Sequence, residues 1–234
     1  MIWQDSLATQ GYAVLPGADA VTVNALITAL ESAGTAGRQR HGAVYAIRNL
    51  LETVPAVAAY ARSPAALELV RAILGPGCFP VRGLLFDKTP EANWKVIWHQ
   101  DLSIAVRERR DVAGFRAWSV KEDVPHVQPP AAILESMLTL RLHLDPCGMN
   151  NGPLRVIPGS HRFGRLSAEG IDEMRQRFAE VEVTAKPADV LLMRPLLLHA
   201  SSSASAPGHR RVIHLEFASG PLPGGLEWHI APCA

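Results

Sequence analysis

Cysteine is scarce in this sequence, and the few that occur form no pattern. The 234 residues contain three cysteines, Cys78, Cys147 and Cys233. The number is odd and no pair has the spacing of metal ligands, which argues against a disulfide framework and against a cysteine metal site. We therefore expect free thiols in a reducing compartment and, by default, a cytoplasmic protein.

Long apolar runs are missing as well. No uninterrupted apolar stretch approaches the about 18 residues that a membrane-spanning helix requires. The first residues, MIWQDSLATQGYAVLPG, show no basic region followed by an apolar run, so we expect no signal peptide.

Neither sign of charge is in excess. Lysine and arginine number 23 and aspartate and glutamate 22, giving a formal net charge of +1. This balance gives no electrostatic reason to expect nucleic acid or a membrane surface as a partner, and a small molecule is the expected one. Clusters of arginine are typical of solvated faces, although Arg107, Arg109 and Arg110 are close enough to the motif described below to meet an anionic substrate.

The composition is that of an ordinary globular protein, 48% hydrophobic. The predicted secondary structure differs between the two parts of the chain. In the N-terminal part, about residues 1–78, residues 21–33 have a helical pattern, and Ser63-Pro64 is typical of the start of a helix that runs to Leu74. From about residue 79 to 234, turn residues separate short β-rich runs: FPVRGLLF, WKVIWHQ, SMLTLRLHL, PLRVIPG, DVLLMR, PLLLHA and RRVIHLEF. The pattern predicts a single domain over residues 1–234, mainly β with flanking helices, whose β core is a sandwich or barrel.

One strand-like segment, VIWHQDLSI at residues 96–104, places an imidazole and a carboxylate two residues apart. Residues i and i+2 of a strand point to the same face, so His99 and Asp101 would lie side by side and Gln100 would face away. A buried carboxylate is costly unless a cation, a hydrogen-bond network or a metal compensates for it. A structural His–Asp pair and a metal site are both open at this point.

A second histidine favours the metal. The segment PLLLHASS, residues 195–202, has a strand pattern that ends at His199. Two histidines and a carboxylate with open coordination positions are the ligand set of non-haem Fe(II) oxygenases. Arg210 follows His199 by eleven residues, and its guanidinium is suited to bind the far carboxylate of 2-oxoglutarate with two parallel hydrogen bonds. The neighbouring Arg211 would face the opposite way.

Four segments of the chain resemble a known family: WHQD (98–101), NNGPLRVIPGSHR (150–162), DVLLMR (189–194), and HAS (199–201) followed by RRVIHLEFA (210–218). Together they resemble the phytanoyl-CoA dioxygenase family of Fe(II)- and 2-oxoglutarate-dependent oxygenases. The resemblance implies a double-stranded β-helix, the cupin-like jelly roll, and hydroxylation or a related oxidation of a small molecule by O₂. It implies Fe(II) held by His99, Asp101 and His199, and 2-oxoglutarate held by Arg210 with a contact from Gln100.

The chain departs from the family in one loop. Ala204 and Ala206 stand where members often have an asparagine and a serine after the distal histidine. The departure leaves the expected ligands in place and affects the hydrogen bonding of the loop.

Residues for the substrate are predicted less directly. Arg141 and His143 flank Leu142 in LTLRLHL and share one face of a strand, which lines the pocket if it faces inward. His126 lies in a proline-rich connection of the kind that can cover a site. Two other functions stay open: a zinc hydrolase on the same ligands, in which Arg210 has no cosubstrate to anchor, and a jelly-roll binding module without catalysis.

Overall fold

The computed structural model describes residues 2–33, 38–40 and 43–231, so that Cys233 lies outside the described residues. Its helices are α1 (Trp3–Gln10), α2 (Ala20–Ala33), α3 (Leu50–Thr53), α4 (Pro55–Ala61), α5 (Pro64–Leu74), α6 (Ala131–Glu135) and α7 (Ala168–Arg177), with two 3-10 turns, η1 (Met149–Asn151) and η2 (Ser160–Phe163).

Its strands are β1 (Tyr12–Pro16), β2 (Arg38–Arg40), β3 (Ala43–Ile47), β4 (Cys78–Lys88), β5 (Val96–His99), β6 (Ile104–Ala105), β7 (Arg116–Lys121), β8 (Val124–Gln128), β9 (Leu138–His143), β10 (Leu154–Val156), β11 (Val181–Val183), β12 (Asp189–Met193), β13 (His199–Ser201) and β14 (Arg210–Ser219).

The larger of the sheets is antiparallel and has the strand order β1-β12-β9-β14-β4-β3-β2. Period-two alternation gives its central strands one apolar and one polar face. Leu138, Leu140 and Leu142 of β9 belong to the main hydrophobic core under the helices, whereas the intervening residues of β9, Arg141 among them, point to the other face. Polar side chains are thereby directed away from the helices, toward the interior between the sheets.

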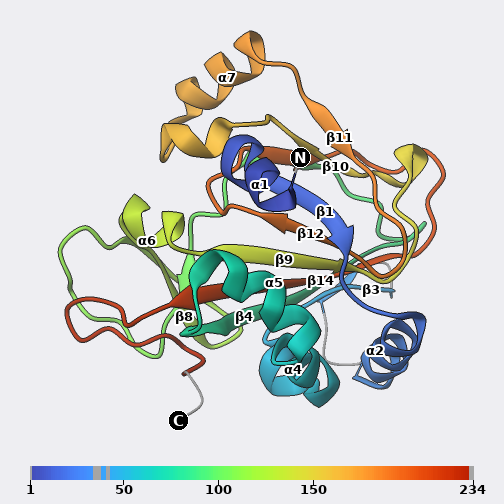
Figure 1. The fold of residues 1–234 in the computed structure, drawn as a ribbon, viewed down its shortest axis with the longest axis horizontal. Helices are drawn as coiled ribbons and strands as arrows, with labels where there is room; N and C mark the ends of the chain where they lie inside the picture. Colours follow the sequence, from blue (N-terminus) through green and yellow to red (C-terminus); the bar gives the residue numbers. More distant parts are fainter. Residues whose placement is uncertain (1, 34–37, 41–42, 232–234) are drawn as a thin grey trace.

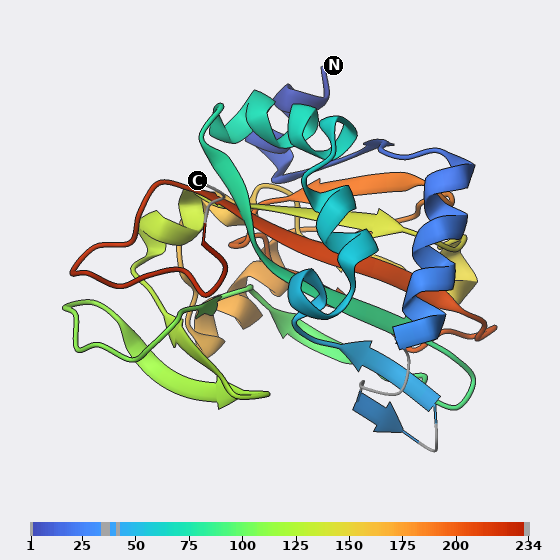
Figure 2. The same cartoon turned by 90° about the horizontal axis from the view of Figure 1, so that it is seen from below.

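Helices α2, α4 and α5 cover the outer face of the larger sheet (Figures 1 and 2). α5 begins as its sequence predicts: the Ser63 side chain accepts a hydrogen bond from the backbone N–H of Ala66 at 3.3 Å, and Pro64 occupies the first turn. Its buried residues, Ala66 and Val70, pack into the same core as the outer face of β9. The helices therefore leave the opposite face of the sheet to build a site.

A smaller sheet, β11-β10-β13-β5, lies against that opposite face. A cluster of buried side chains joins the two sheets, with Leu154 and Val156 from β10 meeting Leu191 and Met193 from β12. Two antiparallel sheets that face each other form the expected jelly roll. A third sheet, β6-β8-β7, and the C-terminal segment extend from one end of it (Figure 2).

Most strand-like runs of the sequence are strands in the structure, with two differences. Residues 195–198 form a turn, closed by a 3.0 Å hydrogen bond from the N–H of Leu197 to Arg194 O, so the strand predicted there begins only at His199. The predicted proline-rich connection around His126 is strand β8, paired with β6 and β7. In the N-terminal part, strands β1 to β3 join the larger sheet, so this part is not purely helical. Among the described residues, no helix has the length and apolar character needed to cross a membrane.

Candidate metal centre and cosubstrate pocket

Two histidines face each other across neighbouring strands of the smaller sheet. His99 is the last residue of β5 and His199 the first of β13, and the antiparallel register pairs them directly. Their ring centroids are 4.2 Å apart. Strand pairing thus brings together two residues that are 100 positions apart in the sequence.

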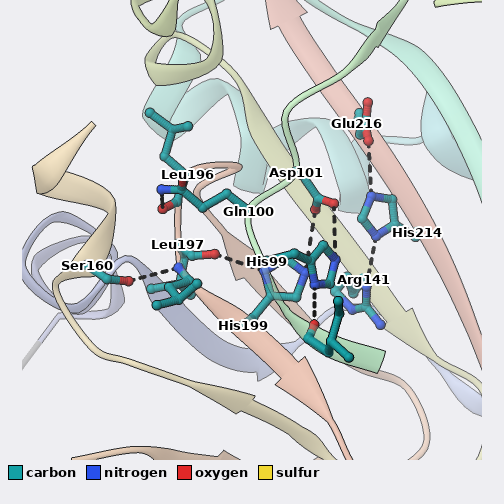
Figure 3. A network of polar contacts seen from close by, with 12 residues as sticks. His99, Gln100, Asp101, Arg141, Ser160, Leu196, Leu197, His199, His214 and Glu216 are labelled. Carbon is teal, nitrogen blue, oxygen red and sulfur yellow. Dashed lines mark hydrogen bonds and ion pairs between the residues drawn. The ribbon is translucent and has the colours of Figure 1, made fainter. Parts of the chain in front are cut away.

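Asp101 completes the cluster from a loop. β5 ends at His99, so Asp101 lies beyond the strand and not, as the i and i+2 argument predicted, within it. Its backbone N–H donates to Pro195 O at 2.9 Å, which fixes the loop against the turn before His199. Its two carboxylate oxygens then lie 3.9 Å from Nε2 of His99 and 3.9 Å from Nε2 of His199 (Figure 3).

Both imidazoles are held in one tautomer. Nδ1 of His99 lies 2.8 Å from Ile97 O, and Nδ1 of His199 lies 2.8 Å from Leu197 O. A carbonyl oxygen only accepts, so each Nδ1 carries the proton and each Nε2 presents its lone pair toward Asp101. Burial lowers the pKa of His199 to about 3, which keeps that ring neutral at pH 7.

The donor set fits a divalent transition metal. One nitrogen of each histidine and one oxygen of Asp101 all lie within 4.8 Å of one another. Oδ2 of Asp101 is buried and has no hydrogen-bond partner among the described residues, which is costly for a carboxylate oxygen unless a cation satisfies it. Second hydrogen bonds from the far ring nitrogens to carbonyls are typical of metal-binding histidines. Two imidazoles and one carboxylate are the ligand set of non-haem Fe(II) sites.

His99, Asp101 and His199 line a cavity, and Arg210, the first residue of β14, lines it as well. Its backbone N–H donates to Asp87 Oδ1 at 3.1 Å, and its guanidinium donates to Gly152 O. Arg211 faces the other way and forms paired hydrogen bonds with Asp145 at 2.8 and 2.9 Å. Of the two adjacent arginines, Arg210 is therefore the one directed at the cavity.

Gly152 permits a close approach of the loop that follows β13. It has a φ of 60°, and a Cβ at this position would lie 2.6 Å from Ser202 O. A side chain would thus meet backbone, and the left-handed conformation favours glycine in addition. The NNGP turn of the sequence places the Gly152 carbonyl where Arg210 reaches it.

The Gln100 amide is engaged with the protein. Its Nε2 donates to Gly164 O at 2.8 Å and to Leu196 O at 2.7 Å, and its Oε1 accepts from the N–H of Leu166 at 2.9 Å. Both N–H groups are used, so its contact with the cosubstrate stays a prediction. These interactions tie the loop that carries Asp101 to two other segments, and Figure 3 shows the contact with Leu196.

The cavity has a volume of about 390 Å³. The smaller sheet, which carries His99 and His199, forms its first wall, and the larger sheet forms its second wall. A chain of polar contacts runs along this wall (Figure 3). Arg141 donates to Nδ1 of His214 at 2.9 Å, and Nε2 of His214 then donates to Glu216 Oε1 at 3.2 Å. Glu216 also pairs with Arg82. Since arginine can only donate, Nδ1 of His214 accepts and Nε2 donates, so the chain of hydrogen bonds has a defined direction.

Of the three residues predicted to contact substrate, Arg141 lines this cavity, and His143 and His126 do not. His143 shares the face of β9 that carries Arg141 and is buried. Neither of its ring nitrogens has a hydrogen-bond partner among the described residues. His126 is buried in β8 with Nδ1 on Val124 O at 2.9 Å. Arg107, Arg109 and Arg110 are not part of this cavity lining, and they pair at the surface with Glu227, Asp111 and Glu108.

The sequence reasoning missed the charged or titratable residues Arg48, Arg82, Lys121 and His214 of the cavity lining, and Glu216, which pairs with Arg82 and His214. For His214 and Glu216 a signal was present, because both follow Arg210 at even spacing on β14 and share its face. Arg82 similarly alternates with Leu84 and Phe86, which line the cavity as well. No local pattern marks Lys121, which enters through the β7–β8 hairpin.

The loop after β13, where the chain departs from the family pattern, is held by a different residue. Asn93 Nδ2 donates to Ala204 O at 2.8 Å, and Asn93 Oδ1 accepts from the N–H of Ala204 at 2.7 Å. The backbone of the loop thus obtains the hydrogen bonds that the alanine side chain cannot supply.

Comparison with known proteins relates this geometry to characterised ones. Ectoine dioxygenase from Sphingopyxis alaskensis is 24% identical over 175 residues, which are 65% of this chain and 50% of that protein. The chain thus spans half the length of this curated relative. The crystal structure of EctD from S. alaskensis with 2-oxoglutarate and 5-hydroxyectoine matches with a TM-score of 0.73 at 21% identity, over 98% of this chain and 84% of that one. AviO1 from Streptomyces viridochromogenes Tue57 matches with a TM-score of 0.65 at 21% identity, over 94% and 96%.

These solved structures confirm the jelly-roll fold. The family assignment comes from the sequence, since the family model described as phytanoyl-CoA dioxygenase (PhyH) matches residues 8–212. This span includes WHQD, NNGPLRVIPGSHR, DVLLMR and HAS, on which the resemblance was based, and it ends within RRVIHLEFA, after Arg210. The chain belongs to the phytanoyl-CoA dioxygenase (PhyH) family.

Proposed function

We propose that this protein is an Fe(II)- and 2-oxoglutarate-dependent dioxygenase that oxidises a small-molecule substrate. One observation carries the proposal: two imidazoles and one carboxylate direct their free donor atoms into a cavity that Arg210 also lines. The relative EctD was solved with 2-oxoglutarate and with 5-hydroxyectoine, which supports this cosubstrate and a small-molecule substrate. In this proposal residues 1–234 form one catalytic domain, because strands from the N-terminal part complete the larger sheet.

The residues of the chain have distinct tasks in the reaction. His99, Asp101 and His199 would hold Fe(II), which supplies the redox chemistry that couples oxidative decarboxylation of 2-oxoglutarate to oxidation of a substrate C–H bond by O₂. Carbonyl groups of Ile97 and Leu197 orient the two imidazoles. Arg210 binds the far carboxylate of 2-oxoglutarate and so fixes the orientation of its keto-acid end. The buried wall of the larger sheet limits access of water.

Reconstitution with different metals tests the proposal. Metal-free protein is loaded anaerobically with Fe(II) or with Zn(II), given 2-oxoglutarate and then exposed to air, and succinate is measured. We expect slow succinate formation with Fe(II) and none with Zn(II), and loss of the Fe(II) activity in His99→Ala. His229→Ala is the matched control, since His229 pairs with Glu52 and lies outside the cavity lining.

Other outcomes separate the alternatives. Ester or amide hydrolysis with Zn(II), and no succinate with Fe(II), would favour the hydrolase. Stoichiometric Fe(II) binding without any conversion of 2-oxoglutarate, alone or with candidate substrates, would contradict the proposal and favour a binding module.

A further inference from the structure

Arg141 is a buried cation without an acidic partner. Its side chain is almost fully enclosed, and it lines the cavity together with His99 and Asp101. Among the described residues it forms no ion pair, and its Nε has no hydrogen-bond partner. A buried charge of this kind is costly unless something else compensates for it.

The surroundings of Arg141 orient it and do not neutralise it. Its one hydrogen bond among the described residues goes to Nδ1 of His214 and not to a carboxylate. The charge of Glu216, further along the same chain, is already paired with Arg82. The ring of Phe86 lies 5.8 Å from the guanidinium carbon and supports one face of it. The guanidinium is thus held in place with donors left over, which is the arrangement of a prepared anion site.

The charge balance of the occupied cavity leads to the same conclusion. In the proposed complex Fe(II) and Arg210 bring three positive charges, and Asp101 and the two carboxylates of 2-oxoglutarate bring three negative charges. Of the other cations in the lining, Arg82 is paired with Glu216 and Arg48 with Glu122. Arg141 and Lys121 remain. Lys121 also lines the cavity, and the hydrogen bond found for its Nζ is to Ser103 Oγ at 3.3 Å. The occupied cavity is therefore short of negative charge.

The size of the cavity restricts what can supply that charge. Its volume of about 390 Å³ is near the lower end of the range for small-molecule sites, roughly 300 to 1,000 Å³, and the cosubstrate takes part of it. The surface arginines that could meet the phosphates of an acyl-CoA, Arg107, Arg109 and Arg110, are not part of the cavity lining, and each has an acidic partner. Both features favour a small free acid over an acyl-CoA ester.

We propose that the substrate is a small carboxylic acid and that Arg141 binds its carboxylate, which makes Arg141 a specificity-determining residue. The proposal rests on the function proposed above. A carboxylate in the cavity could also belong to 2-oxoglutarate, and the experiment distinguishes the two sources.

The test uses the chain of 234 residues loaded anaerobically with Fe(II) and 2-oxoglutarate. The probes are straight-chain monocarboxylic acids of four to eight carbons and the proteinogenic amino acids, each paired with its primary amide. Binding is measured from the change that each probe causes in the visible charge-transfer band, and stimulation of succinate formation in air is the second readout. The variants are Arg141→Gln and Arg141→Lys, with Arg175→Gln on the exposed face of α7 as the matched control.

We expect acids to bind about tenfold or more tightly than their amides, because the amide loses the charge-assisted hydrogen bonds. Arg141→Gln should abolish this preference while its half-saturating 2-oxoglutarate concentration stays near that of the wild type. Arg141→Lys should keep part of the preference, which separates loss of charge from loss of structure. Arg175→Gln should behave as the wild type.

Three results would overturn the proposal. The first is equal binding of acids and amides, or no effect of any acid, in the wild type. The second is a large increase in the required 2-oxoglutarate in Arg141→Gln, which would assign Arg141 to the cosubstrate. The third is the absence of a band in wild type before any probe is added, which marks failure of the proposed function itself.

Discussion

Replacing Gln100 by methionine tests whether the Gln100 amide holds the loop that carries Asp101 in place. Methionine keeps the length of the side chain and removes three hydrogen bonds, to Gly164 O, Leu196 O and the N–H of Leu166. The bond to Leu196 is buried and the other two are partly buried. An unsatisfied buried group costs about 1 to 3 kcal/mol and a more exposed one less, so we expect Gln100→Met to lower the free energy of unfolding by about 2 to 5 kcal/mol.

Urea denaturation of the metal-free protein measures this effect apart from any change in metal affinity. A loss of this size lowers the urea midpoint by about 1 to 2 M in a protein of this length. The matched control is Gln128→Met at the other glutamine of the cavity wall, whose side chain forms no hydrogen bond in the part of the chain that the structure describes. A midpoint for Gln100→Met equal to that of the control would refute the reasoning and return Gln100 to the role of a cosubstrate contact.

Three further predictions concern stability. Burial lowers the pKa of His143 to about 3 from its usual 6.5, so the unfolded chain takes up a proton that the native state does not, and the stability linked to this group is complete above pH 6.5 and lost as the pH falls. Between pH 7 and pH 5 this group lowers the free energy of unfolding of the wild type by about 2 kcal/mol. His143→Leu lacks the group, so between the same two pH values its free energy of unfolding, measured by urea titration, should decrease by about 2 kcal/mol less than that of the wild type. An equal decrease in both proteins would contradict this prediction. Ser63→Ala removes the cap of α5 and should cost about 1 kcal/mol, whereas Ser32→Ala, at an exposed position in α2, should cost less in the same titration. Asn93→Ala removes both hydrogen bonds to Ala204, and mass spectrometry after limited proteolysis should show faster cleavage within residues 202–208; an unchanged rate would show that the loop is held by other contacts.

The elements of this fold with a strong local pattern were predictable from the sequence. α5 has a serine cap, a proline in its first turn and a glycine after its last residue, all of which act within a few residues. β9 and β14 alternate clearly because one face is buried under helices and the other faces the interior. These local patterns predict the observed elements because the tertiary packing buries the same face of each element that the pattern makes apolar.

The run before His199 shows why other segments were misassigned. Residues 195–198 are apolar and resemble a buried strand, yet they form a turn whose leucines enter three separate hydrophobic clusters. Their apolar character reflects burial, which a turn in the interior requires as much as a strand does. Asp101 was placed on the strand of His99 for the same reason, because an apolar flank does not show where hydrogen bonding between strands ends.

The cluster of His99, Asp101 and His199 could be predicted from residue types, and even spacing on β14 indicates that His214 and Glu216 share the face of Arg210, whereas the contacts between these side chains could not be predicted. The direct pairing of His99 with His199 depends on strand register, which no local pattern specifies. Lys88 is fully enclosed, with Nζ donating to Ser201 Oγ at 3.1 Å, and nothing in FDKTP distinguishes it from a surface lysine. The chain from Arg141 through His214 and Glu216 to Arg82 joins three strands, so it exists only once the larger sheet has formed.

Anaerobic titration of the metal-free protein with Fe(II) and then 2-oxoglutarate tests the central claim most directly, through the visible charge-transfer band of the chelate. The account predicts a band in the wild type and none in His199→Ala. Arg210→Ala should require about 30- to 100-fold more 2-oxoglutarate, as expected for the loss of two charge-assisted hydrogen bonds. Arg211→Ala, whose side chain faces away from the cavity, should titrate as the wild type. Bound iron without a band in the wild type, or an unchanged titration in Arg210→Ala, would contradict the account.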